Sequence, residues 1–219
     1  MSELPELVYE HRFSDEDAVE KQALWKVLGA HLQRYVDERA VVLDLACDRG
    51  YFISNITADE RWATDIRDVS AYLPPDVRFV QGNGLTLDSV LPTASFDVVF
   101  TSNYLEHLAS GDDVVQQLRV VCALLRPGGT VIVLQPNVRL LGGAYWDFID
   151  HKVALTERSL EEAGELAGLE TTRVIKRFLP YTTKGRLPMS PLLVRSYLAL
   201  RPAWLLLGKQ TLYIARRPR

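Results

Sequence analysis

The stretch "VVLDLACDRGYF" (residues 41–52) decides the fold of this protein. A run of apolar residues ends at the acidic Asp44, and a short loop then leads toward the next element. Loops of this kind use glycines to let the backbone approach a ligand closely. Two of the expected glycine positions hold Ala46 and Asp48, and only Gly50 remains. The stretch therefore predicts a nucleotide-type α/β domain with a variant ligand loop.

The segments around this stretch alternate between two periodicities. Strand-like apolar runs occupy residues 40–45, 61–66, 77–82, 96–102, 130–136, 170–178 and 210–217. Helical patterns occupy residues 14–36, 51–56, 112–125 and 156–169. Ser14 is the expected cap of the first helix, "RPGG" (126–129) ends the third, and a capping box at Thr156 starts the fourth. This order predicts a doubly wound, mostly parallel seven-stranded sheet with helices on both faces.

Length and element order favour one domain over residues 1–219. Three parts are expected to stand outside the alternation: an N-terminal helical cap (1–38), a long cap loop (137–155) and an insertion before the last strand (179–207).

The insertion is apolar, with basic residues interspersed, namely Lys184, Arg186, Arg195 and Arg201. Packing on the domain or a homodimer contact is favoured, and peripheral contact with an anionic membrane is the alternative.

Composition limits the classes of function. The formal net charge is -3, which does not favour nucleic-acid binding. The two cysteines, Cys47 and Cys122, are too few for a disulfide scaffold, which makes a reducing cytoplasm the default location. The N-terminal segment "MSELPELVYE" lacks the apolar run of a secretion signal, and no run reaches the roughly 20 apolar residues of a membrane span.

Polar residues follow four successive strands of the predicted sheet. Ligands of such sheets bind outside the carboxyl ends of the strands, near the switch in strand order. The residues at these ends are Asp44 to Gly50, Asp65, Asn83, and Ser102 to His107. Four such ends in succession indicate a ligand that contains a nucleoside.

Five segments carry a family resemblance: "VLDLACDRGYF", "WATDI", "VQGNGLTL", "FDVVFTSNYLEHL" and "LRPGGTVIVLQPN". From about residue 40 onward the chain resembles the class I S-adenosylmethionine-dependent methyltransferases. The later segments "YWDFIDHKVALTERSLEEAGELAGL" and "GKQTLYIARRP" are similar to bacterial members associated with sugar or glycan modification.

The resemblance implies S-adenosylmethionine as cofactor and a role for each matching residue. Asp44 would orient the methionine ammonium group, Asp65 would accept the ribose hydroxyls, and Asn83 would approach the adenine amino group. This cofactor has no pyrophosphate, so its loop needs fewer glycines than a dehydrogenase loop does. The full implied set is Asp44, Ala46, Cys47, Asp48, Gly50, Phe52, Asp65, Ile66, Asn83, Gly84, Ser102 and Asn103.

Two histidines are candidates for a general base, which a hydroxyl acceptor needs. His151 is favoured as the base, and His107 is expected to line the site. The structural alternatives are a local packing role for His107 and an exposed loop position for His151. His31 is expected to be structural or exposed, and Cys47 to be a small buried residue rather than a nucleophile.

The expected acceptor contacts are Tyr9, His11, Tyr104, Tyr145, Trp146, Asp147 and Asp150. The aromatics at 145, 146 and 148 form either an acceptor platform or a small core within the loop. A divalent metal such as Mg²⁺ at Asp147, Asp150 and His151 is an alternative, but this spacing is no recognised ligand set, so no metal ligand is predicted.

The sequence thus predicts methyl transfer from S-adenosylmethionine to a saccharide or glycan hydroxyl, without nucleic acid. Another small hydroxylated metabolite or a lipid is the alternative acceptor. A nicotinamide-dependent oxidoreductase would need a G-x-G-x-x-G loop, which "ACDRGYF" does not provide. A catalytically weak binding scaffold is a further alternative, which the missing glycines support.

Overall fold

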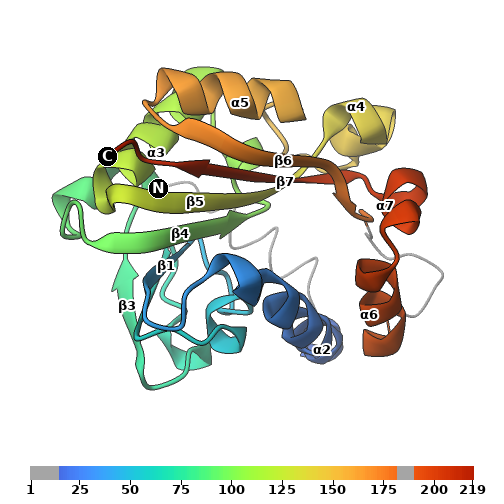
Figure 1. Ribbon diagram of the computed structural model, residues 1–219, viewed down its shortest axis with the longest axis horizontal. Coiled ribbons are helices and arrows are strands. Elements are labelled where there is room, and N and C mark those ends of the chain that lie inside the picture. Colours follow the sequence, from blue (N-terminus) through green and yellow to red (C-terminus); the bar gives the residue numbers. More distant parts are fainter. Residues whose placement is uncertain (1–14, 182–189) are drawn as a thin grey trace.

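The computed structural model describes residues 15–181 and 190–219, and a seven-stranded sheet forms its centre (Figure 1). The strands are β1 (Val41–Leu45), β2 (Glu60–Asp65), β3 (Val77–Gln81), β4 (Phe96–Ser102), β5 (Leu125–Pro136), β6 (Glu170–Leu179) and β7 (Gln210–Arg216). Their order is β3-β2-β1-β4-β5-β7-β6, and β7 runs antiparallel to both of its neighbours. The predicted mostly parallel sheet is confirmed.

Helices cover both faces of the sheet, as Figure 1 shows. They are α2 (Asp15–Leu32), α3 (Gly111–Leu124), α4 (Val138–Leu141), α5 (Glu157–Leu166), α6 (Pro191–Ala199) and α7 (Arg201–Leu207). One buried cluster joins α3 and α5 to the sheet, and the other joins α2, α6 and α7 to its opposite face. Alternation along each strand supplies both clusters: Val42 enters one and Leu43 the other.

The segment after β1 corrects a sequence prediction, because residues 51–56 do not form an α-helix. Only the 3-10 turn Ile53–Asn55 is present. The segment contains β-branched residues and Asn55, whose side-chain amide donates to the Tyr51 carbonyl. Helix α2 packs there instead: Gly29 lies so close to Asn55 that a Cβ at Gly29 would overlap it. The N-terminal helix thus occupies the place of the missing crossover helix.

The first helix ends earlier than predicted, at Leu32, and continues as the 3-10 turn Gln33–Tyr35. Ser14, its expected cap, lies outside the described residues. The later helix starts are confirmed. Ser110 caps α3, and Thr156 and Ser159 form the predicted capping box of α5.

The two later segments that were expected to stand outside the alternation, the cap loop and the insertion, both contain helices. The cap loop holds α4 and a 3-10 segment, Gly142–Asp147. The insertion holds α6 and α7, whose start signals are Ser190 before Pro191 and Pro202 in the first turn. Within the described ranges, no helix is long and apolar enough to cross a membrane.

Candidate cofactor and acceptor site

The loop after β1 has the backbone of a glycine-rich loop with only one glycine. Ala46 and Asp48 both have φ of 56°, and Gly50 has φ of 69°. These values lie in the left-handed region, which glycine adopts freely and other residues adopt at a cost. A Cβ at Gly50 would also overlap the side chain of Leu73. Gly50 is therefore the loop position where space as well as conformation demands glycine.

Asp44 closes β1 as a buried carboxyl beside this loop. It is 3% exposed, and its Oδ2 accepts a hydrogen bond from the Ile53 N–H at 3.3 Å. Burial raises the pKa of Asp44 well above its ordinary value, and the Ile53 N–H opposes that rise. A cationic ligand group beside Asp44 would favour its ionised form, as the implied ammonium partner requires.

Two of the expected cofactor residues contribute little side-chain surface. Phe52 is 2% exposed and stacks on Phe100 with 3.7 Å between ring centroids. Cys47 is buried, and burial raises the pKa of its thiol, so the thiol is neutral, as expected of a small buried residue. Only the backbone of either residue can meet a ligand.

Asp65, at the end of β2, holds a network that includes the loop. Its Oδ2 accepts from the Asp48 N–H at 3.0 Å, and its Oδ1 accepts from Arg67 Nε at 3.1 Å. Asp48 turns toward cations: its carboxylate lies 3.0 Å from Lys21 Nζ and 3.4 Å from Arg67 Nη2. Each oxygen of Asp65 already accepts two hydrogen bonds, Oδ1 from the Arg67 N–H and Nε and Oδ2 from the Asp48 N–H and Arg67 Nη2, so ribose hydroxyls would have to displace the Arg67 side chain from this carboxylate.

The expected adenine region follows β3. Asn83 is exposed, and its Oδ1 accepts from the Leu85 N–H at 3.1 Å, which caps the 3-10 segment Gly84–Ser89. A Cβ at Gly84 would overlap the Tyr104 hydroxyl and Gln117. The side chain of Ile66, 44% exposed beside Asp65, is the apolar surface at this end.

Tyr104, one of the expected acceptor contacts, is half-buried and supports this loop through its hydroxyl. Its hydroxyl donates to Gln117 Oε1 at 2.8 Å, and Gln117 Nε2 donates to the Gly84 carbonyl at 3.0 Å. The polar end of Tyr104 is therefore committed to the protein.

Ser102 and Asn103 lie at the carboxyl end of β4, next to β1. Asn103 has φ of 49°, and its N–H donates to the Leu134 carbonyl at 2.9 Å. Its Nδ2 donates to Ser102 Oγ at 3.0 Å. The two side chains thus meet at the switch in strand order, where ligands of such sheets bind.

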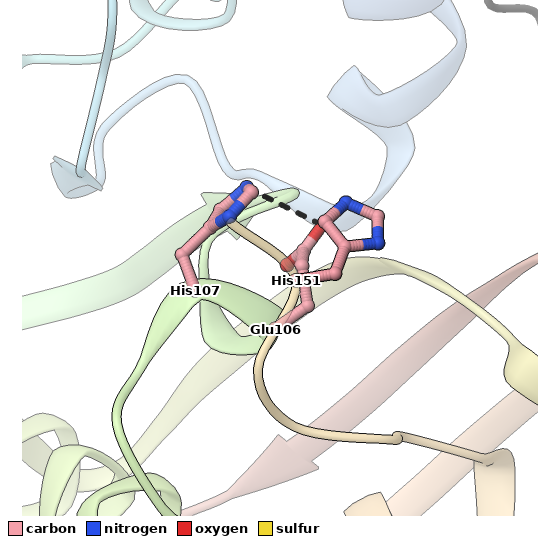
Figure 2. A group of neighbouring side chains, drawn as sticks. All are labelled: Glu106, His107 and His151. Atoms are coloured by element: carbon pink, nitrogen blue, oxygen red, sulfur yellow. Dashed lines mark ion pairs between the residues drawn. The ribbon is translucent and has the colours of Figure 1, made fainter. Parts of the chain in front are cut away.

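Glu106, His107 and His151 meet just beyond this point (Figure 2). Glu106 is 1% exposed, and its Oε2 accepts from Gln135 Nε2 at 2.8 Å. The two imidazole rings lie 5.1 Å apart, and His107 Nε2 lies 3.8 Å from Glu106 Oε1. The predicted pair of histidines is thus brought together, around a buried carboxylate that the sequence analysis did not single out.

Hydrogen bonds orient both imidazoles. His151 Nδ1 lies 2.6 Å from the Tyr145 carbonyl oxygen, and His107 Nδ1 lies 3.0 Å from the Asp150 carbonyl oxygen. A carbonyl only accepts, so each Nδ1 is the donor, and the neutral ring of His151 carries its lone pair on Nε2. Burial lowers the pKa of His151, although Glu106 acts against that shift, so the ring is neutral near pH 7.

For Tyr145, burial favours the second of the two alternatives, a small core within the loop. It is fully buried, and its hydroxyl donates to the Val153 carbonyl. Trp146 remains 50% exposed and Asp147 is exposed, whereas Asp150 binds His107 through its carbonyl. Tyr9 and His11 lie outside the described residues.

The groups that could hold a divalent cation differ from the set considered from the sequence. Ligand atoms of Glu106, His107 and His151 lie within 4.8 Å of one another. Within the described residues, these three form the group of histidine and carboxylate side chains that could hold a metal ion. Asp147 and Asp150 do not belong to it.

Sequence reasoning missed Glu106, Arg67 and Lys21. Glu106 had a signal, since it follows Leu105 and precedes His107 in "YLEHL", just after a buried strand. Arg67 and Lys21 had none, because their contacts with Asp48 join segments that only the fold brings together.

Fold and site together define an α/β domain with polar side chains gathered at the carboxyl edge of its sheet, the edge at which ligands of such sheets bind. A family model described as "Methyltransferase domain" matches residues 20–174, and the chain belongs to this family. The family implies S-adenosylmethionine as cofactor. A comparison with curated protein sequences finds no match.

Solved structures of the same fold agree. A chain from the complex of the Haloferax volcanii Trm112 methyltransferase activator and a protein described as a methyltransferase is 16% identical, with a TM-score of 0.67 and coverage of 94% of this chain and 95% of that chain. A SAM-dependent methyltransferase from Archaeoglobus fulgidus is 18% identical, with a TM-score of 0.62 and coverage of 88% and 94%. The [4+2]-cyclase SpnF also matches, at 17% identity, a TM-score of 0.61 and coverage of 88% and 80%. The fold alone therefore does not fix the reaction.

Proposed function

We propose that this methyltransferase is an O-methyltransferase that acts on a hydroxyl of a saccharide or glycan. The His151 imidazole, with its lone pair on Nε2 and with His107 and the buried Glu106 carboxylate beside it, supports this proposal more than any other feature. A hydroxyl must lose its proton as it is methylated, and this cluster offers a proton acceptor at the carboxyl edge of the sheet.

The residues at that edge fit S-adenosylmethionine, which supplies a methyl group activated on a sulfonium. Asp44 is a buried carboxyl suited to its ammonium group, and Asp65 is a carboxylate suited to ribose hydroxyls. The left-handed positions of Ala46, Asp48 and Gly50 shape the loop that would lie along it. The chain's remaining task is to hold the acceptor and remove its proton.

His151 is the proposed proton acceptor. Its Nδ1–H is held by the Tyr145 carbonyl, so the ring is fixed and Nε2 can take the hydroxyl proton. Glu106 then faces an imidazolium and stabilises it, since its second oxygen is satisfied by Gln135. His107 lines the site beside His151.

The exposed part of the cap supports a saccharide acceptor. Trp146 is 50% exposed and Ile149 is 81% exposed, and both lie within four residues of the fixed Tyr145. Aromatic faces pack well on the C–H surfaces of sugars. The exposed Asp147 can accept hydrogen bonds from sugar hydroxyls. We further propose that the enzyme works in the cytoplasm, which suits its two free cysteines.

A methyl-transfer screen tests this proposal, with sugars, glycosides and oligosaccharides as acceptors and S-adenosylhomocysteine release as the readout. We expect release that depends on a hydroxylated acceptor. His151→Ala should lower kcat by roughly 10²-fold or more and leave the affinity for S-adenosylhomocysteine unchanged, because this ring acts on the acceptor. His107→Ala should cost less, and His31→Gln, on the far helix α2, should keep kcat. A fully active His151→Ala variant would contradict the assignment.

Chelation separates His151 from a bound cation as the activating group. We expect transfer to survive dialysis against EDTA, because Nε2 of His151 accepts the proton directly. Loss of activity on chelation, with recovery on adding one divalent cation, would instead assign Glu106, His107 and His151 to that cation.

A further inference from the structure

Helices α6 and α7 present an unusual apolar surface to solvent. Six leucines on or between them are each more than half exposed: Leu192 73%, Leu193 56%, Leu200 59%, Leu205 70%, Leu206 80% and Leu207 56%. We call these six residues the leucine surface. Isolated exposed leucines are common on proteins, but six of them on one pair of neighbouring helices are a concentration of the kind that marks interaction sites.

The opposite sides of these helices are firmly packed, so the leucines point outward by construction. Leu198 is 6% exposed and Trp204 is 8% exposed. Trp204 Nε1 donates to the Tyr197 carbonyl at 2.9 Å, and the Tyr197 hydroxyl donates to the Phe178 carbonyl at 2.9 Å. The Trp204 ring also packs edge-on against Phe178, with 5.2 Å between centroids. Helices α6 and α7 therefore bury Leu198 and Trp204 against the domain and expose the leucine surface to solvent.

Exposed basic residues lie on the same helices as the leucine surface and next to them in the chain. Arg195 lies within α6, Arg201 begins α7 and Lys209 follows it, and all three are exposed. Residues 171–219 contain eleven lysines and arginines and no aspartate or glutamate, although the whole chain has a net charge of -3. The positive charge of the molecule is thus concentrated in the segment that carries the leucine surface.

We propose that the leucine surface docks on an anionic lipid bilayer. Leucines flanked by arginine and lysine suit the bilayer interface, where apolar side chains enter the acyl boundary and cations meet acidic headgroups. Helices of nine and seven residues are too short to span a membrane, so they would lie along its surface. Two other occupants of the leucine surface fit less well. A symmetric second copy of the chain would place like charges opposite one another. Nucleic acid would leave the leucines without an apolar partner.

The leucine surface lies at the same edge of the sheet as the site. Helices α6 and α7 connect the end of β6 to the start of β7, where Leu179 pairs with Gln210. Gln210 in turn pairs with Pro136, at the carboxyl end of β5. Figure 1 shows α4, α6 and α7 together at this end of the molecule. Docking would therefore turn the site's edge toward the bilayer. If the proposed function holds, an acceptor linked to a lipid could then reach it.

Vesicle binding by the whole protein tests the proposal without requiring turnover. Co-sedimentation would compare phosphatidylcholine vesicles with vesicles that also contain about 30% phosphatidylglycerol. We expect binding to the anionic vesicles that weakens as salt rises from about 0.1 M to about 0.5 M. The double variant Leu205→Ser/Leu206→Ser and the double variant Arg195→Gln/Arg201→Gln should each weaken it at least about tenfold.

Leu166→Ser is the matched control, because Leu166 is 60% exposed on α5, on the opposite face of the sheet. It should bind as the unchanged protein does, and circular dichroism should show every variant folded. Absent binding to anionic vesicles overturns the proposal. Binding that the leucine and arginine variants leave unchanged also overturns it. So does a stable dimer in sedimentation velocity that Leu205→Ser/Leu206→Ser dissociates, because a second copy would then occupy the surface.

Discussion

Ala46 and Asp48 adopt a backbone conformation that glycine would adopt more cheaply. Both have φ of 56°, and the side chain of Asp48 gains Lys21 and Arg67 as ionic partners in return. Asp tolerates this region better than most residues, whereas Ala gains nothing from its methyl group there. The departure from the usual sequence is therefore a change of side chain on an unchanged backbone path.

Replacing Ala46 with glycine should stabilise the protein. Ala46→Gly relieves the left-handed strain but adds freedom to the unfolded chain, so we expect a gain of about 0.5–1 kcal/mol in the free energy of unfolding by urea. Gly50→Ala should instead lose at least about 1 kcal/mol, because its Cβ would overlap Leu73. A destabilised Ala46→Gly variant would show that the methyl group has a packing role.

Some site residues could be predicted singly and others could not. Asp44 and Asp65 end strands whose apolar patterns are clear, so their positions at the carboxyl edge follow from the sequence. The alternatives open for Tyr145 depended on its burial and on the bond from its hydroxyl to the Val153 carbonyl, which the sequence does not show. The convergence of His107 and His151 on Glu106 likewise depends on how the cap folds back over β4.

At the scale of elements, a buried polar network anchors the cap. Asn137 is 1% exposed, and its Nδ2 donates to Glu157 Oε2 at 2.7 Å and to Thr211 Oγ1 at 3.0 Å. Burial by itself would raise the pKa of Glu157, but the hydrogen bonds from Asn137 and Lys176 outweigh it and lower that pKa. The network joins the start of the cap to α5 and β7.

Removing this anchor should loosen the cap. Asn137→Ala leaves a buried carboxylate short of a donor, so we expect a loss of about 2–3 kcal/mol in the free energy of unfolding and a higher KM for the acceptor. Glu162→Ala is the control, at an exposed position on α5, the helix that carries Glu157. It should change the free energy of unfolding by less than about 0.5 kcal/mol. Equal stability of the two variants would contradict the anchoring role.

Contact between α2 and the C-terminal helices should make stability depend on pH. The His31 ring lies 6.0 Å from Trp204, and burial, followed by Arg34 and Arg201, lowers the pKa of His31 from 6.5 to about 4. The unfolded chain therefore binds this proton first, so stability is complete above about pH 6.5 and falls as the pH drops toward about 4.

Measuring the free energy of unfolding as a function of pH checks this predicted fall. Between about pH 7 and about pH 5, the free energy of unfolding of His31→Gln should decrease by up to about 1 kcal/mol less than that of the unchanged protein, after allowance for the half-buried ring. Parallel curves for the two proteins would show that His31 does not contribute.

For the whole molecule, the mostly parallel seven-stranded sheet follows from the seven apolar runs and the helical segments between them, whereas the order of the strands comes from the structure alone. The replacement of the first crossover helix by α2 could not be predicted, because it depends on contact between Gly29 and Asn55 across the chain. The outward leucines of α6 and α7 could not be predicted either, since the sequence pattern of an apolar helix does not show which of its residues face the core and which face solvent.

The central claim is that the carboxyl edge of the sheet binds S-adenosylmethionine through a loop with one glycine. Calorimetric titration of S-adenosylhomocysteine into the whole protein tests it most directly, with Asp65→Asn as the variant and NAD as the competing ligand. We predict saturable binding of S-adenosylhomocysteine, at least about tenfold weaker in Asp65→Asn, and no heat from NAD. Binding of NAD without S-adenosylhomocysteine, or equal binding by the Asp65→Asn variant, would contradict the account.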